Sequence, residues 1–229
     1  MPGLLALLVR DNRFLMKLYY MLIDSERFHQ SLTPALGASW RCRSFQPCQT
    51  LCAELLPASK AFAERYHIDI EGSLIGQIKG DFPFDRNIWR ALVGEILLYS
   101  AAEAPELPTV FATLRCLLTG KTEAESDRQA FTPIDQIALG SRDLIFGGGF
   151  YRPDQAGLND REDVARLSEY LNSINLETWS ASALEAASEL HSEEEREGEL
   201  EFIRQEFPNL RQIYDRALGN RQVIACEKL

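Results

Sequence analysis

The feature that most limits the fold of this chain is a strand-forming segment near each of its two ends. The first segment covers residues 17–24 (KLYYMLID), and the second covers residues 221–226 (RQVIAC). Aromatic and β-branched side chains favour the extended backbone of a strand. The residues between the two segments show mostly helical periodicity. We therefore predict an α+β fold, a mostly helical single domain with a small sheet that includes both strands.

Helices are expected where apolar residues recur at steps of three and four. The predicted helices cover residues 25–32, 48–65, 86–103, 106–118, 132–140, 160–174 and 193–218. We expect Pro57 to interrupt or kink one helix and Pro208 to break the last, because proline removes a backbone donor. Residues 33–47 are predicted to be irregular, and residues 66–84 to form short strands or an irregular insertion.

The chain is acidic, with 34 Asp and Glu residues against 24 Lys and Arg residues and a formal net charge of −10. Nucleic acids and anionic lipids require a positive patch, so binding to either is disfavoured. The same field helps a partner with a basic surface, although acidity also simply keeps many proteins soluble. No segment approaches the roughly 20 apolar residues of a membrane span, and the first residues lack signal-peptide features. We therefore expect a cytoplasmic protein.

The cysteines and histidines do not form a recognisable metal-binding pattern. An odd number of cysteines without an export signal indicates reduced thiols rather than disulfides. The five cysteines are Cys42, Cys48, Cys52, Cys116 and Cys226. The three histidines are far apart in the sequence: His29, His67 and His191. Paired ligands at short spacing are typical of zinc sites, so we predict no metal site and no cofactor.

Several short motifs suggest chemistry but lack the context that the chemistry needs. Gly120-Lys121-Thr122 resembles the end of a phosphate-binding loop, but the glycine required five residues earlier is Arg115. A helix end is the better interpretation. Asp81 and Asp85 are close enough to act as paired carboxylates, and turn formation and helix capping explain them as well. Ser141 lacks the glycines of a nucleophile elbow, and no catalytic residue is predicted.

The glycine run 147–149 is the place where we expect a ligand pocket, if the chain has one. Three residues without a Cβ tolerate positive φ and allow close approach of a ligand. Polar and aromatic side chains flank the run, and the predicted ligand-binding residues are Arg142, Asp143, Gly148, Tyr151 and Arg152. A turn that joins two core segments explains the glycines without any ligand.

The acidic run Glu193, Glu194 and Glu195 opens the last predicted helix. Such a run is typical of a solvated helix face. It is also a candidate docking surface for a partner protein with a basic surface. Both interpretations stay open at the level of the sequence.

Five segments occur in the order seen in the YfbM-like family, a bacterial family of unknown function. They resemble its first strand and helix, a helix that ends in Leu-Thr-Gly, a small helix with a Gly-rich turn, a further helix, and the closing helix and strand. The segments are 18–32 (LYYMLIDSERFHQSL), 110–120 (VFATLRCLLTG), 132–149 (TPIDQIALGSRDLIFGGG), 158–174 (LNDREDVARLSEYLNSI) and 207–226 (FPNLRQIYDRALGNRQVIAC). The resemblance thus covers residues 17–32 and about 106–226.

The chain departs from the family pattern in three places. Phe111 and Arg115 stand where the family commonly has an aromatic-and-histidine pattern, so no role of that histidine is carried over. Residues 34–105 form an enlarged insertion within a single YfbM-like domain, residues 17–229. Residues 1–16 are an N-terminal extension, and Met16 is a candidate initiator because strand-forming residues follow it directly.

Two classes of function remain open. The first is a non-catalytic protein-interaction protein of an accessory or immunity type, which uses the acidic C-terminal helices or the insertion to bind its partner. The second is a small-molecule-binding protein or enzyme with a pocket beside Gly147–Gly149. The first is favoured because the motifs above lack a nucleophile, a general base and a nucleotide loop.

Overall fold

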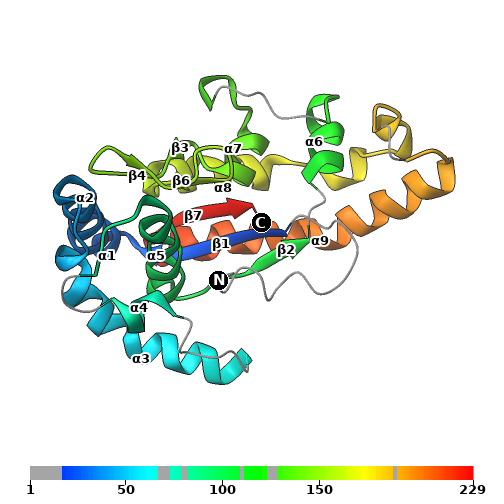
Figure 1. Cartoon of the computed structure of the whole chain (residues 1–229). Coiled ribbons are helices and arrows are strands. Elements are labelled where there is room, and N and C mark those ends of the chain that lie inside the picture. Colours follow the sequence, from blue (N-terminus) through cyan, green and yellow to red (C-terminus); the bar gives the residue numbers. More distant parts are fainter. Residues whose placement is uncertain are drawn as a thin grey trace. The chain divides into compact units, whose positions relative to one another are not determined.

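The computed structural model describes residues 17–66, 73–78, 82–108, 111–122, 128–187 and 190–228 (Figure 1). The α+β, mostly helical fold class is confirmed. Both predicted strands are present, as β1 (Lys17–Asp24) and β7 (Gln222–Lys228). Residues 1–16, including the candidate initiator Met16, lie outside the described residues. No described helix combines the length and the apolar character that crossing a bilayer requires.

A five-stranded sheet has the order β2-β1-β7-β6-β3. Its other strands are β2 (Glu106–Pro108), β6 (Ala156–Asn159) and the two-residue β3 (Arg142–Asp143). β1 and β2 are antiparallel with Leu18 opposite Leu107, and β6 and β7 are antiparallel with Leu158 opposite Ala225. The strands from the two ends of the chain, β1 and β7, are therefore neighbours in one sheet.

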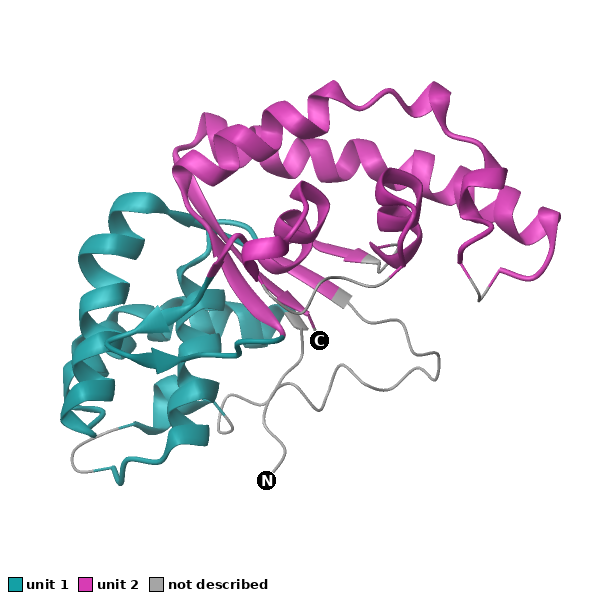
Figure 2. Ribbon diagram, turned by 90° about the horizontal axis from the view of Figure 1, so that it is seen from above, with its two compact units in different colours: residues 1–14, 21–104, 143–154 teal, residues 15–20, 105–142, 155–229 magenta. Residues whose placement is uncertain are grey.

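The chain divides into two compact units, which Figure 2 shows in different colours. The first unit contains residues 21–104 and 143–154, and the second contains residues 15–20, 105–142 and 155–229. The division does not test the prediction of a single domain, which stays a prediction. Each unit is described separately below.

The second unit contains most of the sheet and the C-terminal helices. Its helices are α6 (Phe111–Thr119), α7 (Pro133–Leu139), α8 (Arg161–Ser173) and α9 (Glu193–Gly219), with 3-10 turns at Arg128–Ala130, Leu176–Thr178 and Ala181–Leu184. α8 packs along α9, and both contact β7, as does α7. Six successive residues of β7 are buried. Since successive side chains of a strand point to opposite faces, both faces of β7 are covered.

The first unit is built from helices and one small hairpin. Its helices are α1 (Ser25–Arg27), a π-helical turn (Phe28–Leu32), α2 (Thr33–Cys42), a 3-10 turn (Gln46–Cys48), α3 (Gln49–Tyr66), α4 (Leu74–Gln77) and α5 (Arg86–Ser100). The hairpin joins β4 (Ile145–Phe146) to β5 (Gly149–Phe150). The Trp89 ring, fully buried, contacts the rings of Trp40 and Phe146 at the centre of this unit.

Three predictions from local sequence are wrong. Residues 33–42 form helix α2 rather than an irregular stretch, because the buried side of this helix, which includes Leu36, packs against β4. Residues 106–108, predicted as the start of a helix, form strand β2, and residues 111–119 form helix α6. Within the stretch 66–84, predicted to form short strands or an irregular insertion, residues 74–77 form a short helix, and its backbone N–H groups at Leu74 and Ile75 donate to the Glu95 carboxylate.

The helix break expected at Pro208 is also wrong, and of the interruption or kink expected at Pro57 the interruption is absent. α3 continues through Pro57, and α9, which is 27 residues long in total, continues through Pro208. Both prolines lie on exposed faces, where water can satisfy the carbonyl that loses its partner. The buried residues Phe207 and Leu210 beside Pro208 hold the helix in place. Packing therefore outweighs the roughly 3 kcal/mol by which an interior proline disfavours a helix.

The end of α7 packs directly against β6. Gly140 ends the helix at φ +78°, and a Cβ on either Gly140 or Gly157 would overlap backbone atoms of the other segment. The Arg128 guanidinium stabilises the same contact by donating to the carbonyl oxygens of Leu139 (2.5 Å), Gly140 (2.8 Å) and Ala156 (2.7 Å). This packing requires the absence of both side chains.

We expect Gly157→Ala to lower the free energy of unfolding by about 3 kcal/mol or more. The added Cβ would overlap the carbonyl oxygen of Leu139, and backbone atoms cannot move aside as a flexible side chain can. Urea unfolding followed by circular dichroism measures the change. The matched control is Gly198→Ala in α9, where no heavy atom lies within 4 Å of the new Cβ. That variant should gain about 0.5–1 kcal/mol, and an equal loss in both variants would contradict the packing argument.

Candidate functional site

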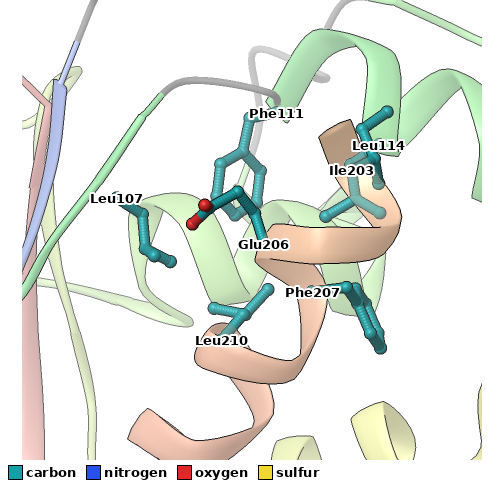
Figure 3. A pocket seen from close by; sticks show the side chains of 7 residues that line it. All are labelled: Leu107, Phe111, Leu114, Ile203, Glu206, Phe207 and Leu210. Carbon is teal, nitrogen blue, oxygen red and sulfur yellow. The ribbon is translucent and has the colours of Figure 1, made fainter. Parts of the chain in front are cut away.

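A shallow groove lies between β2, α6 and α9 in the second unit (Figure 3). Six apolar side chains and one carboxylate line it. They are Leu107, Phe111, Leu114, Ile203, Glu206, Phe207 and Leu210. The enclosed volume is about 10 Å³, which is roughly the space of one water molecule. Pockets for small ligands usually enclose about 300–1,000 Å³, so the groove is too small for a cofactor and offers a partner a shallow apolar surface.

The apolar wall of the groove follows from helical spacing. Ile203, Phe207 and Leu210 recur at steps of four and three on α9, which places them on one face. Phe111 and Leu114 are three residues apart at the start of α6. Most of these side chains are buried, whereas Phe111 is half-exposed and gives the groove an accessible apolar edge.

Glu206 introduces a negative charge at the apolar wall. Its residue is half-exposed, and one carboxylate oxygen accepts a hydrogen bond from the Asn209 side-chain amide at 3.2 Å. Figure 3 shows this carboxylate among the apolar side chains of the groove. A cation that approaches the groove would therefore meet a carboxylate at its rim.

The negative charge continues along α9 toward its N-terminus. Residues 193–206 contain seven glutamates and two arginines. Glu195 closes a capping box with Ser192, and the backbone N–H groups of Ser192 and His191 donate to its carboxylate and lower its pKa. Glu193 and Glu194 are exposed. Of the predicted partner-binding residues, Glu195 is thus engaged in capping, and the other two face solvent.

The residues predicted to bind a ligand beside the glycine turn are divided between the two units. Arg142, in the second unit, pairs with Asp160 at 2.7 Å and Asp163 at 3.2 Å. The other four belong to the first unit. Of these, Asp143 and Arg152 are half-buried and Tyr151 is buried. Gly148 is exposed and has a φ of +92° in the turn. None of the five lines the groove described above, and the pocket beside the turn stays a prediction.

The other sequence motifs have structural roles where they are described. Gly120 ends α6 at φ +71°, as expected for a helix end. Asp85 caps α5 by accepting from the backbone N–H groups of Asn87 and Ile88. Asp81 and His67 lie outside the described residues. Within the described residues, no group of three or more His, Cys, Asp or Glu residues could hold a metal ion.

The groove itself was missed at the level of the sequence. Leu107 was assigned to a helix, and the break expected at Pro208 divided the apolar stripe of α9. The stripe at 203, 207 and 210, with Glu206 beside it, is the signal that would have indicated an apolar surface next to a charge.

Comparison with known proteins returns little beyond a similar structure. No model of a protein family matches the chain, and no curated protein matches it. Among solved structures, YfbM of Escherichia coli, a protein of unknown function, is similar with a TM-score of 0.48 and 15% identity. The alignment covers 93% of this chain and 99% of YfbM. This is the family that the five sequence segments resemble, and a likeness at this level carries no conclusion about activity, ligand or partner.

The five cysteines are all free thiols, as predicted. Burial raises the pKa of Cys48 to about 11 and the pKa values of Cys52 and Cys226 to about 12. Burial also raises the pKa of Cys116. Cys42, at the end of α2, is exposed. Because the thiolate is the reactive form, the four buried thiols stay protonated and unreactive near pH 8.

We expect Ellman's reagent at pH 8 to modify one thiol of the native protein rapidly and all five after unfolding in guanidinium chloride. Cys42→Ser should remove the rapid phase and leave the other four thiols unchanged. Absorbance of the released thiolate counts the modified cysteines. A rapid phase that persists in Cys42→Ser would show that a buried thiol is accessible and would contradict the described packing.

Proposed function

We propose that the chain is a non-catalytic interaction protein that binds a basic, amphipathic segment of a partner protein in the α6–α9 groove. The observation that carries this proposal is one carboxylate, Glu206, in an apolar wall on a helix whose N-terminal half is acidic. An accessory or immunity-type role fits such a protein.

The two properties of the groove select the two properties of the partner. Apolar side chains spaced at three and four residues on a partner helix can pack on a shallow apolar surface of this kind, and helix-in-groove packing is a common mode of peptide recognition. Lysine or arginine residues on the same helix would face Glu206 and the glutamates of α9. The apolar contact supplies most of the affinity, whereas complementary charge increases the association rate and selects the partner.

The dimensions of the groove favour this function over an enzyme or a small-ligand receptor. The apolar wall offers surface to bury, but only one charged group lies in it. A catalytic site needs a nucleophile or a base together with a group that orients it. The residues lining the groove provide a hydrophobic contact with one electrostatic determinant.

We expect a synthetic helical peptide of leucine and lysine to bind the protein with a micromolar Kd, and Glu206→Lys to weaken this binding at least tenfold. The variant replaces an attraction at the groove by a repulsion. Isothermal titration calorimetry measures both dissociation constants. Far-UV circular dichroism establishes that the variant keeps its helices.

The matched control is Glu169→Lys, which makes the same charge change at an exposed position of α8. It should leave the Kd within about twofold of the unchanged protein, apart from the small effect of net charge. Equal weakening by the two variants would show that the peptide senses only overall charge. That result, or the absence of binding at millimolar peptide, would contradict the proposed groove function.

A further inference from the structure

A cluster of four arginines surrounds one tryptophan in the first unit. The cluster consists of Trp40, Arg41 and Arg43 at the end of α2, with Arg86 and Arg90 from the first turns of α5. Arg41, Arg43 and Arg86 are exposed, and Arg90 is half-exposed. We call these five residues the arginine–tryptophan cluster.

Contacts with aromatic rings orient the guanidinium groups. The Arg43 guanidinium lies 4.1 Å from the centroid of the Trp40 ring and 5.5 Å from that of Phe84. The Arg86 guanidinium lies 5.7 Å from the same Trp40 centroid. Cation–π contacts of this kind hold a guanidinium in place while its N–H donors remain available to an anion.

The β4–β5 hairpin lies against the cluster. Gly149 packs on the Trp40 ring so closely that a Cβ there would overlap the indole. Arg90 donates from Nε to the carbonyl oxygen of Phe150 at 3.3 Å. Gly37 of α2 also lies close to the hairpin and to Arg41. A Cβ added to Gly37 would be 3.1 Å from the backbone nitrogen of Gly147 and 3.3 Å from Nη1 of Arg41. The hairpin is therefore packed on Trp40 and bonded to Arg90 at its edge.

No carboxylate neutralises this surface within the described residues. Arg115, Arg142 and Arg166 of the second unit have carboxylate partners within 4.0 Å, but none lies within that distance of Arg41, Arg43, Arg86 or Arg90. Acidic residues outnumber basic ones by 34 to 24 in this chain. The positive charge of the cluster is therefore not compensated by any carboxylate of the described residues, although the chain as a whole is acidic.

The hairpin carries an exposed apolar pair on its outer face. Successive side chains of a strand point to opposite faces and Gly149 packs on Trp40, so this pair points away from the Trp40 ring. Ile145 is 44% exposed and Phe150 is 43% exposed, and the two residues are directly opposite each other in the antiparallel ladder. Large apolar side chains grouped at the surface are typical of interaction sites. Arginine and aromatic residues are also enriched where protein interfaces gain most of their energy.

We propose that the arginine–tryptophan cluster and the β4–β5 hairpin bind an acidic segment of a protein that also carries apolar side chains. Guanidinium groups bind carboxylates through paired N–H donors, and the apolar side chains of the segment cover Ile145 and Phe150. A nucleic acid fits less well, because the guanidinium of Arg43 already lies over the Trp40 ring on which a base would stack. The site is independent of the α6–α9 groove, which selects the opposite charge.

The test is binding of a synthetic peptide of glutamates with two central leucines, measured by fluorescence anisotropy at low ionic strength. We expect the double variant Arg43→Ala/Arg86→Ala to raise the Kd at least tenfold. Phe150→Ala, which keeps the backbone contact to Arg90, should raise it severalfold. Arg161→Ala, at an exposed position of α8, is the matched control and should leave the Kd unchanged. Thermal unfolding establishes that each variant is folded.

Several outcomes would overturn the proposal. The first is an equal effect of Arg161→Ala, and the second is no binding of the acidic peptide at millimolar concentration. The third is that a single-stranded oligothymidylate with the same charge as the acidic peptide binds as tightly as the peptide does. This result would assign the surface to nucleic acid. Glu206→Lys should leave binding of the acidic peptide intact, so failure of this proposal is distinguishable from failure of the groove function.

Discussion

The contact between Gly140 and Gly157 is the constraint on which the second unit depends most. It brings the last turn of α7 against β6 at backbone distance, and Arg128 binds carbonyl oxygens on both sides of it. Asn159, two residues after Gly157, is then fully buried. Its side-chain oxygen accepts from the Ser141 backbone at 2.8 Å, and its amide nitrogen donates to the Gln136 carbonyl at 2.9 Å. A side chain at either glycine would separate these partners, and a buried amide without partners is costly.

The same asparagine connects this packing to α9 and so to the groove. Asn159 donates to the hydroxyl of Tyr214 at 2.9 Å, and that hydroxyl donates to the Ile137 carbonyl at 3.2 Å. Tyr214 is one helical turn beyond Leu210, the last residue of the groove. Residues three and four positions apart lie on the same side of a helix, so the orientation of α9 about its axis that turns Phe207 and Leu210 toward α6 also buries Tyr214. A polar network in the core thus orients an apolar surface at its edge.

Sequence predicted what depends on local chemistry and missed what depends on packing. The strands β1 and β7, the helix predicted over 160–174 and the helix end at Gly140 follow from residues a few positions apart. Strand β2 does not, because its identity comes from pairing with β1, 87 positions away between Tyr19 and Glu106. The continuity of α9 through Pro208 also depends on buried neighbours. The groove and the arginine–tryptophan cluster were missed because both combine residues from elements distant in sequence.

The net charge of −10 conceals two surfaces of opposite sign, one in each unit. The glutamates of α9 lie beside an apolar stripe, and Arg90 of the arginine–tryptophan cluster bonds to the backbone of the hairpin that exposes Ile145 and Phe150. Charge alone gives little affinity at a solvated surface, because water and salt screen it. Apolar contact alone gives little selectivity, since any apolar segment can make it. An unpaired charge at the edge of an apolar contact disfavours partners that carry a charge of the same sign. Such a partner would have to bury its own charge next to a like charge. Under the two proposals made above, both surfaces would therefore use the same physical means of discrimination and would select partners of opposite charge.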